Sequence, residues 1–232
     1  MGACPALTGC AFLPAGATAQ ADQLHQVWSV FFYAGLFVAV VVYALILGPL
    51  FVWRRRGDGY PPQFRRNNKL EVFYTVVPLL IVAALFALTY KKETSVEQLV
   101  ARPDATVDVI AFAWSWKFHY PGGALDIVGT PQKPPEMVIP VEGTTRINLT
   151  STDVNHAFWV PGFLFKRDAI AGISNHFDLR PIRTGTYRGQ CAEFCGLDHA
   201  LMSFTIRVVS AADYRRWLQA HNIKQTASTG GP

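Results

Sequence analysis

Two long runs of mainly apolar residues occupy the first half of the chain. The first extends from Val27 to Trp53 and the second from Val72 to Tyr90, and neither contains a charged residue. A membrane-spanning helix needs roughly 20 consecutive apolar residues, which both runs approach or exceed. The pattern therefore predicts a transmembrane helical hairpin over residues 27–92.

The segment between the two runs, residues 54–69, is short and strongly basic. Its Gly- and Pro-rich centre cannot continue a helix. Short loops with an excess of Lys and Arg stay on the cytoplasmic side of a membrane, so both termini are expected on the outer face. Lys91 and Lys92 oppose this orientation, but the loop outweighs them with Arg54, Arg55, Arg56, Arg65, Arg66 and Lys69.

From Val107 onward the pattern changes to short alternating stretches rich in β-branched and aromatic residues. The longest runs from Val107 to Tyr120, and further strands are expected at 136–140, 145–150, 157–160 and 204–209. Many short strands separated by Pro, Gly and Asp are typical of a β-sandwich or barrel. An all-β domain is therefore predicted over residues 93–221, closing with an amphipathic helix at 211–221 and followed by a disordered tail at 222–232.

Residues 1–26 form an N-terminal tail of small and mostly uncharged residues. Within it, Leu7-Thr-Gly-Cys10 resembles a bacterial lipobox, in which Cys10 would be lipidated after cleavage. The basic start and long apolar run expected before such a site are missing, so a loosely packed tail is the alternative. The predicted location is the plasma membrane of a bacterium, with the β domain on the outer face.

Composition narrows the function further. The net charge is +5, but much of the positive excess sits in the basic loop, so it does not indicate a nucleic-acid partner. No Cys-x2-Cys-His motif occurs, so the chain is expected to carry no haem of its own.

One short loop concentrates metal-binding residue types. Cys191, Cys195, His199 and Met202 follow the spacing Cys-x3-Cys-x3-His-x2-Met, and His156 offers a second imidazole from upstream. Thiolate, imidazole and thioether together suit copper better than magnesium or calcium. Two thiolates also allow both sulfurs to bridge a pair of copper ions. A disulfide or half of a zinc site remain the alternatives, although zinc has no need of the methionine.

The loop resembles the copper A loop of cytochrome c oxidase subunit II, and the resemblance covers roughly residues 27–221. It implies a cupredoxin-like sandwich that binds two copper ions. Cys191 and Cys195 would bridge the ions. The terminal ligands would be His156 and His199, with Met202 and the Glu193 carbonyl as weak axial ligands.

The resemblance also gives meaning to Trp114 and Trp116. Two residues apart in the predicted strand, they would share one face and indicate a core or cross-strand aromatic pair. In the family, a tryptophan at the position of Trp114 is exposed where cytochrome c docks and electrons enter. Ser115 stands where family members often have a further aromatic residue.

Charged residues near this site also resemble those of the family. Glu142 and Asp153 resemble carboxylates of the surface that docks cytochrome c. Lys117 and His119 make the same patch less acidic, so a less basic donor is expected.

Two further carboxylates match family positions. Glu71 begins the second apolar run and resembles the acidic residue at the mouth of a proton channel into subunit I, although a helix-start carboxylate favoured by the helix dipole explains it equally well. The side chain of Glu193 would help to bind magnesium at the contact with subunit I.

The resemblance implies a subunit through which electrons enter a respiratory oxidase. It would accept electrons from cytochrome c and pass them to haem in subunit I, where oxygen is reduced to water. Its partners would be subunit I, further oxidase subunits, a cytochrome c donor and membrane lipid. The alternatives are a copper-free structural subunit of a quinol oxidase, which lacks the two cysteines and the histidines, and a membrane-anchored copper carrier or zinc domain.

Overall fold

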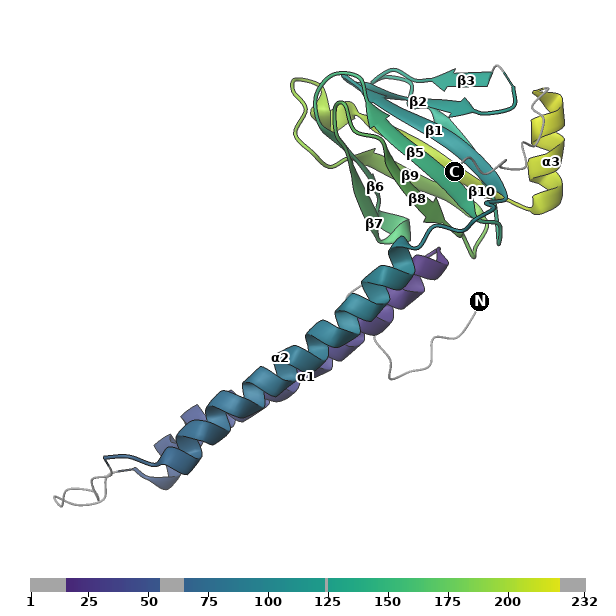
Figure 1. Cartoon of the computed structure of the whole chain (residues 1–232). Coiled ribbons are helices and arrows are strands. Elements are labelled where there is room, and N and C mark those ends of the chain that lie inside the picture. Colours follow the sequence, from purple (N-terminus) through teal and green to yellow (C-terminus); the bar gives the residue numbers. More distant parts are fainter. Residues whose placement is uncertain (1–15, 55–64, 124, 222–232) are drawn as a thin grey trace. The chain divides into compact units, whose positions relative to one another are not determined.

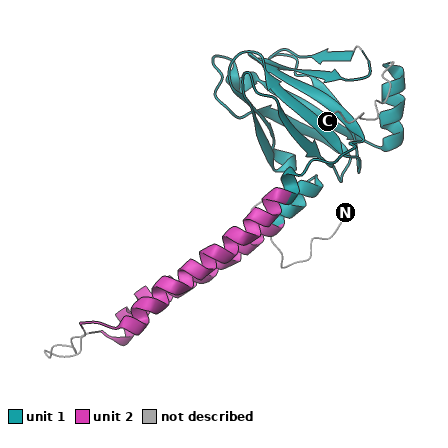
Figure 2. Ribbon diagram, in the orientation of Figure 1, with its two compact units in different colours: residues 1–25, 95–232 teal, residues 26–94 magenta. Residues whose placement is uncertain are grey.

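A computed structural model of the protein describes residues 16–54, 65–123 and 125–221. Within these limits the chain forms two compact units (Figure 2). One unit is residues 26–94, and the other combines residues 1–25 with 95–232. Cys10, most of the basic loop and the C-terminal tail lie outside the described residues.

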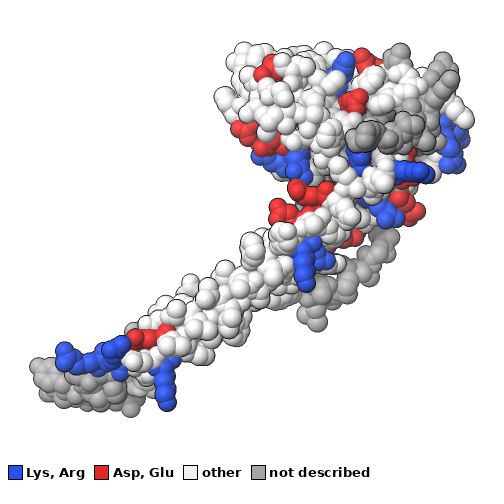
Figure 3. Space-filling view, in the orientation of Figure 1, with Lys and Arg blue, Asp and Glu red and all other residues white. Residues whose placement is uncertain are grey.

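The first unit is built from two long helices, α1 (Ala19–Val52) and α2 (Asn68–Glu97) (Figure 1). The start of α1, residues 19–25, and the end of α2, residues 95–97, belong to the second unit. Both are long and apolar enough to cross a membrane. Their large apolar side chains are mostly exposed, and Figure 3 shows the middle of this unit free of charged side chains. An exposed apolar helix surface of this kind fits lipid rather than water.

The two helices are longer than the predicted apolar runs. α1 begins eight residues before Val27, and α2 continues through Lys91 and Lys92 to Glu97. A helix need not end where its apolar run ends, because polar side chains beyond the run can face water or pair. One such pair joins the helices, since the Lys92 ammonium donates to the Gln26 side-chain oxygen at 2.8 Å.

The second unit is a β-sandwich, as predicted, with two five-stranded sheets. The first sheet has the order β3-β2-β1-β5-β8 and the second β4-β10-β9-β6-β7. Two pairings, β1 with β5 and β10 with β4, are parallel, and the others are antiparallel. The strands are β1 (Ala105–Phe112), β2 (Ser115–Tyr120), β3 (Leu125–Val128), β4 (Glu136–Pro140), β5 (Thr145–Ser151), β6 (His156–Val160), β7 (Phe165–Ala169), β8 (Asn175–Leu179), β9 (Gly185–Cys191) and β10 (Ser203–Val209).

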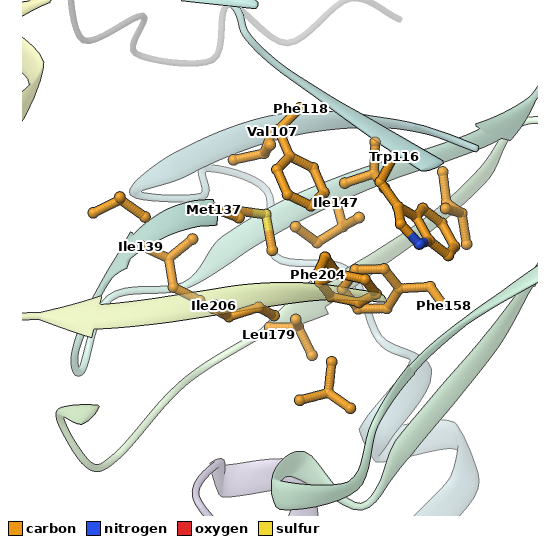
Figure 4. Close-up of a cluster of buried hydrophobic side chains, with 14 of the residues drawn as sticks. Val107, Trp116, Phe118, Met137, Ile139, Ile147, Phe158, Leu179, Phe204 and Ile206 are labelled. Atoms are coloured by element: carbon orange, nitrogen blue, oxygen red, sulfur yellow. The ribbon is translucent and has the colours of Figure 1, made fainter. Parts of the chain in front are cut away.

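Aromatic and aliphatic side chains together fill the space between the sheets (Figure 4). Buried and half-buried residues alternate along β1 and β5, so every second side chain points inward. Phe204 lies at the centre of the cluster, with ring centroids 4.7 Å from Phe158 and 5.1 Å from Trp116. Burial of these large rings is the main force that holds the two sheets together.

The predicted strand at 107–120 is in fact two strands. β1 ends at Phe112 and β2 begins at Ser115, and these residues pair directly across an antiparallel hairpin. Trp114 therefore lies in the hairpin turn and is half-buried, whereas Trp116 is completely buried in the core. The expectation that both rings share one strand face was wrong, because alternation along the sequence continues through a two-residue turn without a visible break.

A partly buried ion pair between β5 and β8 also holds the segment that precedes β1. Arg146 donates from Nε to one oxygen of Asp178 at 2.7 Å and from a terminal nitrogen to the other at 3.0 Å. Asp178 is only 5% exposed, and it also accepts the Val100 amide at 2.7 Å. The carboxylate thus satisfies both a guanidinium and a peptide N–H, which makes its burial tolerable.

The short helix α3 (Ala211–Ala220) closes the domain close to its predicted range. Ser210 caps it, because the Ser210 hydroxyl accepts the Asp213 amide. Tyr214 and Leu218 are its buried residues, four positions apart on one face.

Because Phe204 touches rings from both sheets, Phe204→Ala should open a cavity that the surroundings cannot fill. We expect it to lower the free energy of unfolding by about 3–5 kcal/mol. Chemical unfolding of the full chain in detergent, followed by near-ultraviolet circular dichroism, measures the change. Val128→Ala, at a side chain 58% exposed, is the control. Equal effects of the two substitutions would contradict the central role of Phe204.

Candidate metal centre

The loop between β9 and β10 carries most of the predicted ligands. Cys191 is the last residue of β9, and Met202 directly precedes β10. These strands are antiparallel neighbours, and the Cys191 amide donates to the Met202 carbonyl at 2.9 Å. Strand pairing therefore brings the two ends of the loop together.

His156 reaches the same place from another strand. It is the first residue of β6, which pairs with β9 on the side opposite β10. Phe158 on β6 faces Cys191 on β9 in the register. The order of strands in the sheet therefore places the His156 imidazole beside the loop.

The five predicted side-chain ligands converge within short distances. Cys191 Sγ lies 3.9 Å from Cys195 Sγ and 3.8 Å from His156 Nδ1. Cys195 Sγ lies 3.5 Å from His199 Nδ1 and 3.7 Å from Met202 Sδ. Each cysteine therefore has its own imidazole, and the two sulfurs face each other between the two rings.

The carbonyl oxygen of Glu193 completes the cluster. It lies 3.2 Å from Cys191 Sγ, while the carboxylate end of the residue is exposed. The Met202 sulfur lies near the Cys195 sulfur, and the Glu193 carbonyl oxygen lies near the Cys191 sulfur. Each cysteine sulfur thus has one imidazole and one weak donor near it.

Burial makes this cluster distinct from surface groups of acids and histidines. His156 is completely buried, and Cys191, Cys195 and Met202 are nearly so. In the part of the chain that the structure describes, His156, Cys191 and Cys195 form the one group of potential metal ligands whose donor atoms all lie within 4.8 Å of one another.

The two thiols differ in acidity. Burial raises the pKa of Cys191, but hydrogen bonds with His156 and with nearby backbone groups outweigh this and lower it to about 7. Burial and then the negative charge on Cys191 raise the pKa of Cys195 to about 12. One thiolate therefore forms readily and opposes the second, and a cation between them would relieve that repulsion.

These residues fit copper. The donors are two thiols, a thioether, two imidazoles and a carbonyl, a soft-to-borderline set. Both cysteines are free in the structure rather than joined as a disulfide. The cluster can hold soft metal ions on two facing sides, with both sulfurs between them.

Trp114 lies beside the cluster. Its indole N–H donates to the Cys195 carbonyl at 2.9 Å. Gly196 packs against the same ring, and a Cβ there would lie 3.1 Å from the indole nitrogen. Sequence reasoning missed Gly196, although a glycine directly after a ligand cysteine is the available signal for a close approach.

Asp153 makes contacts that the sequence did not reveal. It was grouped with surface carboxylates, but it accepts from His156 Nε2 at 2.8 Å and from the Ala113 amide at 2.6 Å. Partial burial raises its pKa, but these and other hydrogen bonds lower it overall. The available signal was an aspartate three residues before a candidate ligand histidine.

Other predicted residues lie elsewhere. Glu71 is in the first turn of α2 in the helical unit and does not belong to the cluster. Lys117 and His119 both pair with Asp126, at 3.1 and 2.7 Å. Asp126 therefore partly neutralises the charge of Lys117, and the hydrogen bonds from His119 and then Lys117 hold the pKa of Asp126 below its usual value.

Comparison with known proteins gives the family. The family described as "Cytochrome C oxidase subunit II, periplasmic domain" matches residues 131–209, and the transmembrane domain of the same subunit matches residues 6–91. The probable cytochrome c oxidase subunit 2 of Streptomyces avermitilis is 36% identical, over 91% of this chain and 81% of the relative. The chain belongs to the cytochrome c oxidase subunit II family.

Other proteins are also similar to this chain. The cytochrome c oxidase subunit 2 of Corynebacterium glutamicum is 32% identical, over 88% of this chain and 74% of the relative. The crystal structure of the periplasmic domain of subunit II of cytochrome oxidase of Bradyrhizobium japonicum is 35% identical, with a TM-score of 0.49, over 53% of this chain and 97% of that one.

Membership of the cytochrome c oxidase subunit II family confirms several predictions. The chain is a membrane protein and one subunit of an oxidase that contains further subunits. The predicted fold, two long apolar helices followed by a β-sandwich, is also confirmed. The cluster of cysteines, histidines and methionine fits the copper A centre that the family implies.

Gly196→Ala should disturb Trp114. The φ angle of Gly196 is +114°, and its Cβ would crowd the indole. We expect a loss of about 1–3 kcal/mol in the free energy of unfolding, together with a shifted Trp114 indole N–H resonance. Gly172→Ala is a matched control, because its φ is also positive, at +79°, but open space surrounds it. A Trp114 resonance that is unchanged in Gly196→Ala, or shifted as much by Gly172→Ala, would refute the contact.

Proposed function

We propose that this chain is the subunit through which electrons enter a terminal respiratory oxidase. It receives electrons from cytochrome c outside the membrane and passes them to haem in subunit I, where oxygen is reduced to water. The observation that carries the proposal is the buried double set of soft donors around Cys191 and Cys195, in a chain of the subunit II family.

Two copper ions would be held by six groups. Cys191 and Cys195 would hold both ions through their sulfurs, and His156 and His199 would each supply one imidazole. When bound, the copper pair supplies a one-electron carrier shared between two metals. The protein holds the donors in place through strand pairing and burial, so that gain and loss of an electron require little movement. The weak donors are the Met202 sulfur and the Glu193 carbonyl.

Trp114 is the residue at which electrons enter. Its ring is half-buried, with one edge hydrogen-bonded to the Cys195 carbonyl. The path from the ring to the Cys195 sulfur therefore crosses one hydrogen bond and a few covalent bonds. A cytochrome c bound over this ring would have a short route to the donor cluster.

The remaining assignments place the subunit in its complex. α1 and α2 both cross the plasma membrane of a bacterium, with the basic loop in the cytoplasm and the sandwich on the outer face. Glu71 would then lie at the cytoplasmic edge, where a carboxylate can gather protons for subunit I. The exposed carboxylate of Glu193 would bind magnesium at the contact with subunit I.

A copper-free structural subunit, as in quinol oxidases, is the alternative of the same fold. The filled ligand set disfavours it, because a structural subunit has no need of five buried or partly buried donor side chains facing one another. Copper content separates the two functions directly.

The first test is the metal content of the full chain in its purified oxidase. We expect two coppers in this chain and an electron paramagnetic resonance spectrum of one unpaired electron shared over both. Cys195→Ser should abolish that shared spectrum, because a hydroxyl does not bridge copper as a thiolate does. Cys4→Ser, outside the described residues, is the control. A copper-free wild type, or an unchanged spectrum in Cys195→Ser, would refute the assignment.

The second test concerns Trp114. Trp114→Ala should slow electron uptake from reduced cytochrome c by roughly an order of magnitude or more, because the placed ring and its contact with Cys195 are lost. Stopped-flow oxidation of the donor measures the rate, and copper content should stay normal. Trp217→Ala, on α3, controls for loss of a tryptophan elsewhere. Unchanged uptake in Trp114→Ala would remove its role.

A further inference from the structure

Asp153 holds two parts of the site with one carboxylate. It lies in the loop between β5 and β6, three residues before His156. One oxygen is 2.8 Å from His156 Nε2 and also accepts the Val154 amide at 2.7 Å. The other oxygen accepts the Ala113 amide at 2.6 Å. The side chain therefore accepts hydrogen bonds on both of its edges.

The bond to His156 fixes which ring nitrogen faces the sulfurs. His156 Nδ1 is 3.8 Å from Cys191 Sγ, and Nε2 is turned to Asp153. A ring that donates its Nε2 proton to a carboxylate keeps the Nδ1 lone pair free for a metal. Asp153 is therefore the acceptor that favours the tautomer with the proton on Nε2.

The bond to Ala113 fixes the turn that carries Trp114. Ala113 and Trp114 connect β1 to β2, and the Thr152 amide donates to the Ala111 carbonyl at 3.1 Å beside them. The Trp114 ring is held at its far end by the Cys195 carbonyl. The turn is thus attached to the donor cluster at two points, of which Asp153 is one.

We propose that Asp153 is a positioning residue. Its carboxylate holds both the His156 ring and the turn that carries Trp114, and so keeps Trp114 in a fixed position relative to the donor cluster. This inference rests on the proposed function, since it assigns Asp153 to the same electron route. It replaces the expectation that Asp153 serves the surface that docks cytochrome c.

The contacts distinguish the two roles. A docking carboxylate works through its free charge, whereas both oxygens of Asp153 are already bonded within the domain, and its side chain is 35% exposed. Three of its bonds are shorter than 2.9 Å. Its acceptor capacity is therefore directed inward, to the ligand ring and the turn.

Asp153→Asn tests this role because an amide cannot accept hydrogen bonds on both of its edges, as the carboxylate does. Asparagine offers one acceptor edge and one donor edge. With its oxygen toward His156, its NH₂ meets the Ala113 N–H. In the opposite orientation, its NH₂ faces His156 Nε2, and the ring must move its proton to Nδ1, toward the sulfurs. The first orientation loses the bond to Ala113, and the second keeps both bonds only by putting a proton on Nδ1, where the lone pair for a metal should be.

The experiment compares wild type, Asp153→Asn and Glu142→Gln in the purified oxidase. Glu142→Gln removes the same charge from an exposed residue of the same domain. We expect Asp153→Asn to weaken copper retention against a chelator by about 10- to 100-fold, to change the copper electron paramagnetic resonance spectrum and to slow electron uptake. Glu142→Gln should retain copper and the wild-type spectrum.

The docking role predicts a different result. If Asp153→Asn keeps copper and spectrum unchanged, and raises only the KM for cytochrome c and its sensitivity to salt, the positioning role is wrong. A wild type without the copper spectrum would instead refute the proposed function, and this outcome is separate from any effect of Asp153→Asn.

Amide hydrogen exchange of the full wild-type chain decides the matter even if the variant does not fold. The Ala113 amide, bonded to Asp153, should exchange at least about tenfold more slowly than an exposed loop amide. Exchange of Ala113 at the rate of an exposed loop amide would overturn the proposal, with or without copper.

Discussion

The site depends on the position of β9 between β6 and β10 in the second sheet. Pairing with β10 closes the loop from Cys191 to Met202, and pairing with β6 delivers His156. Side chains alternate along a strand, so a slip of one residue in either pairing would turn Cys191 or His156 to the other face. The packed rings around Phe204, at the start of β10, resist such a slip because they fix which face of each strand is buried.

The electrostatic repulsion between two neighbouring thiolates favours a bound cation at this cluster. The first thiolate, on Cys191, forms easily beside His156, and its charge then opposes ionisation of Cys195. A protein that needed only a folded core would not bury two thiols 3.9 Å apart with an imidazole at each side. The cost of this cluster without a cation is offset by the binding of one, so the stability of the loop and its metal content are linked.

Local patterns in the sequence predicted much of the architecture. The apolar runs gave the two helices, and alternation with turn residues gave the sandwich. The spacing of Cys191, Cys195, His199 and Met202 predicted a cluster because all four lie in one loop. The sequence did not predict the turn at Ala113 and Trp114, because a two-residue turn leaves the alternation of side chains intact. The hydrogen bonds of Asp153 to Ala113 and His156 were not predicted, because these partners come together only after β1, β5 and β6 have assembled.

The same interactions explain how Trp114, the proposed residue of electron entry, can sit in a turn. A turn is normally the most mobile part of a hairpin, and mobility at Trp114 would vary its distance from the donor cluster. Here the turn is attached to the cluster from both sides, by the Asp153 carboxylate at Ala113 and by the Cys195 carbonyl at the indole. Gly196 lets the ring lie close, since any side chain there would push it away. The rigidity of the loop that carries the donor cluster therefore extends to the half-buried Trp114 ring, and a donor protein docked as proposed would find that ring in one fixed place.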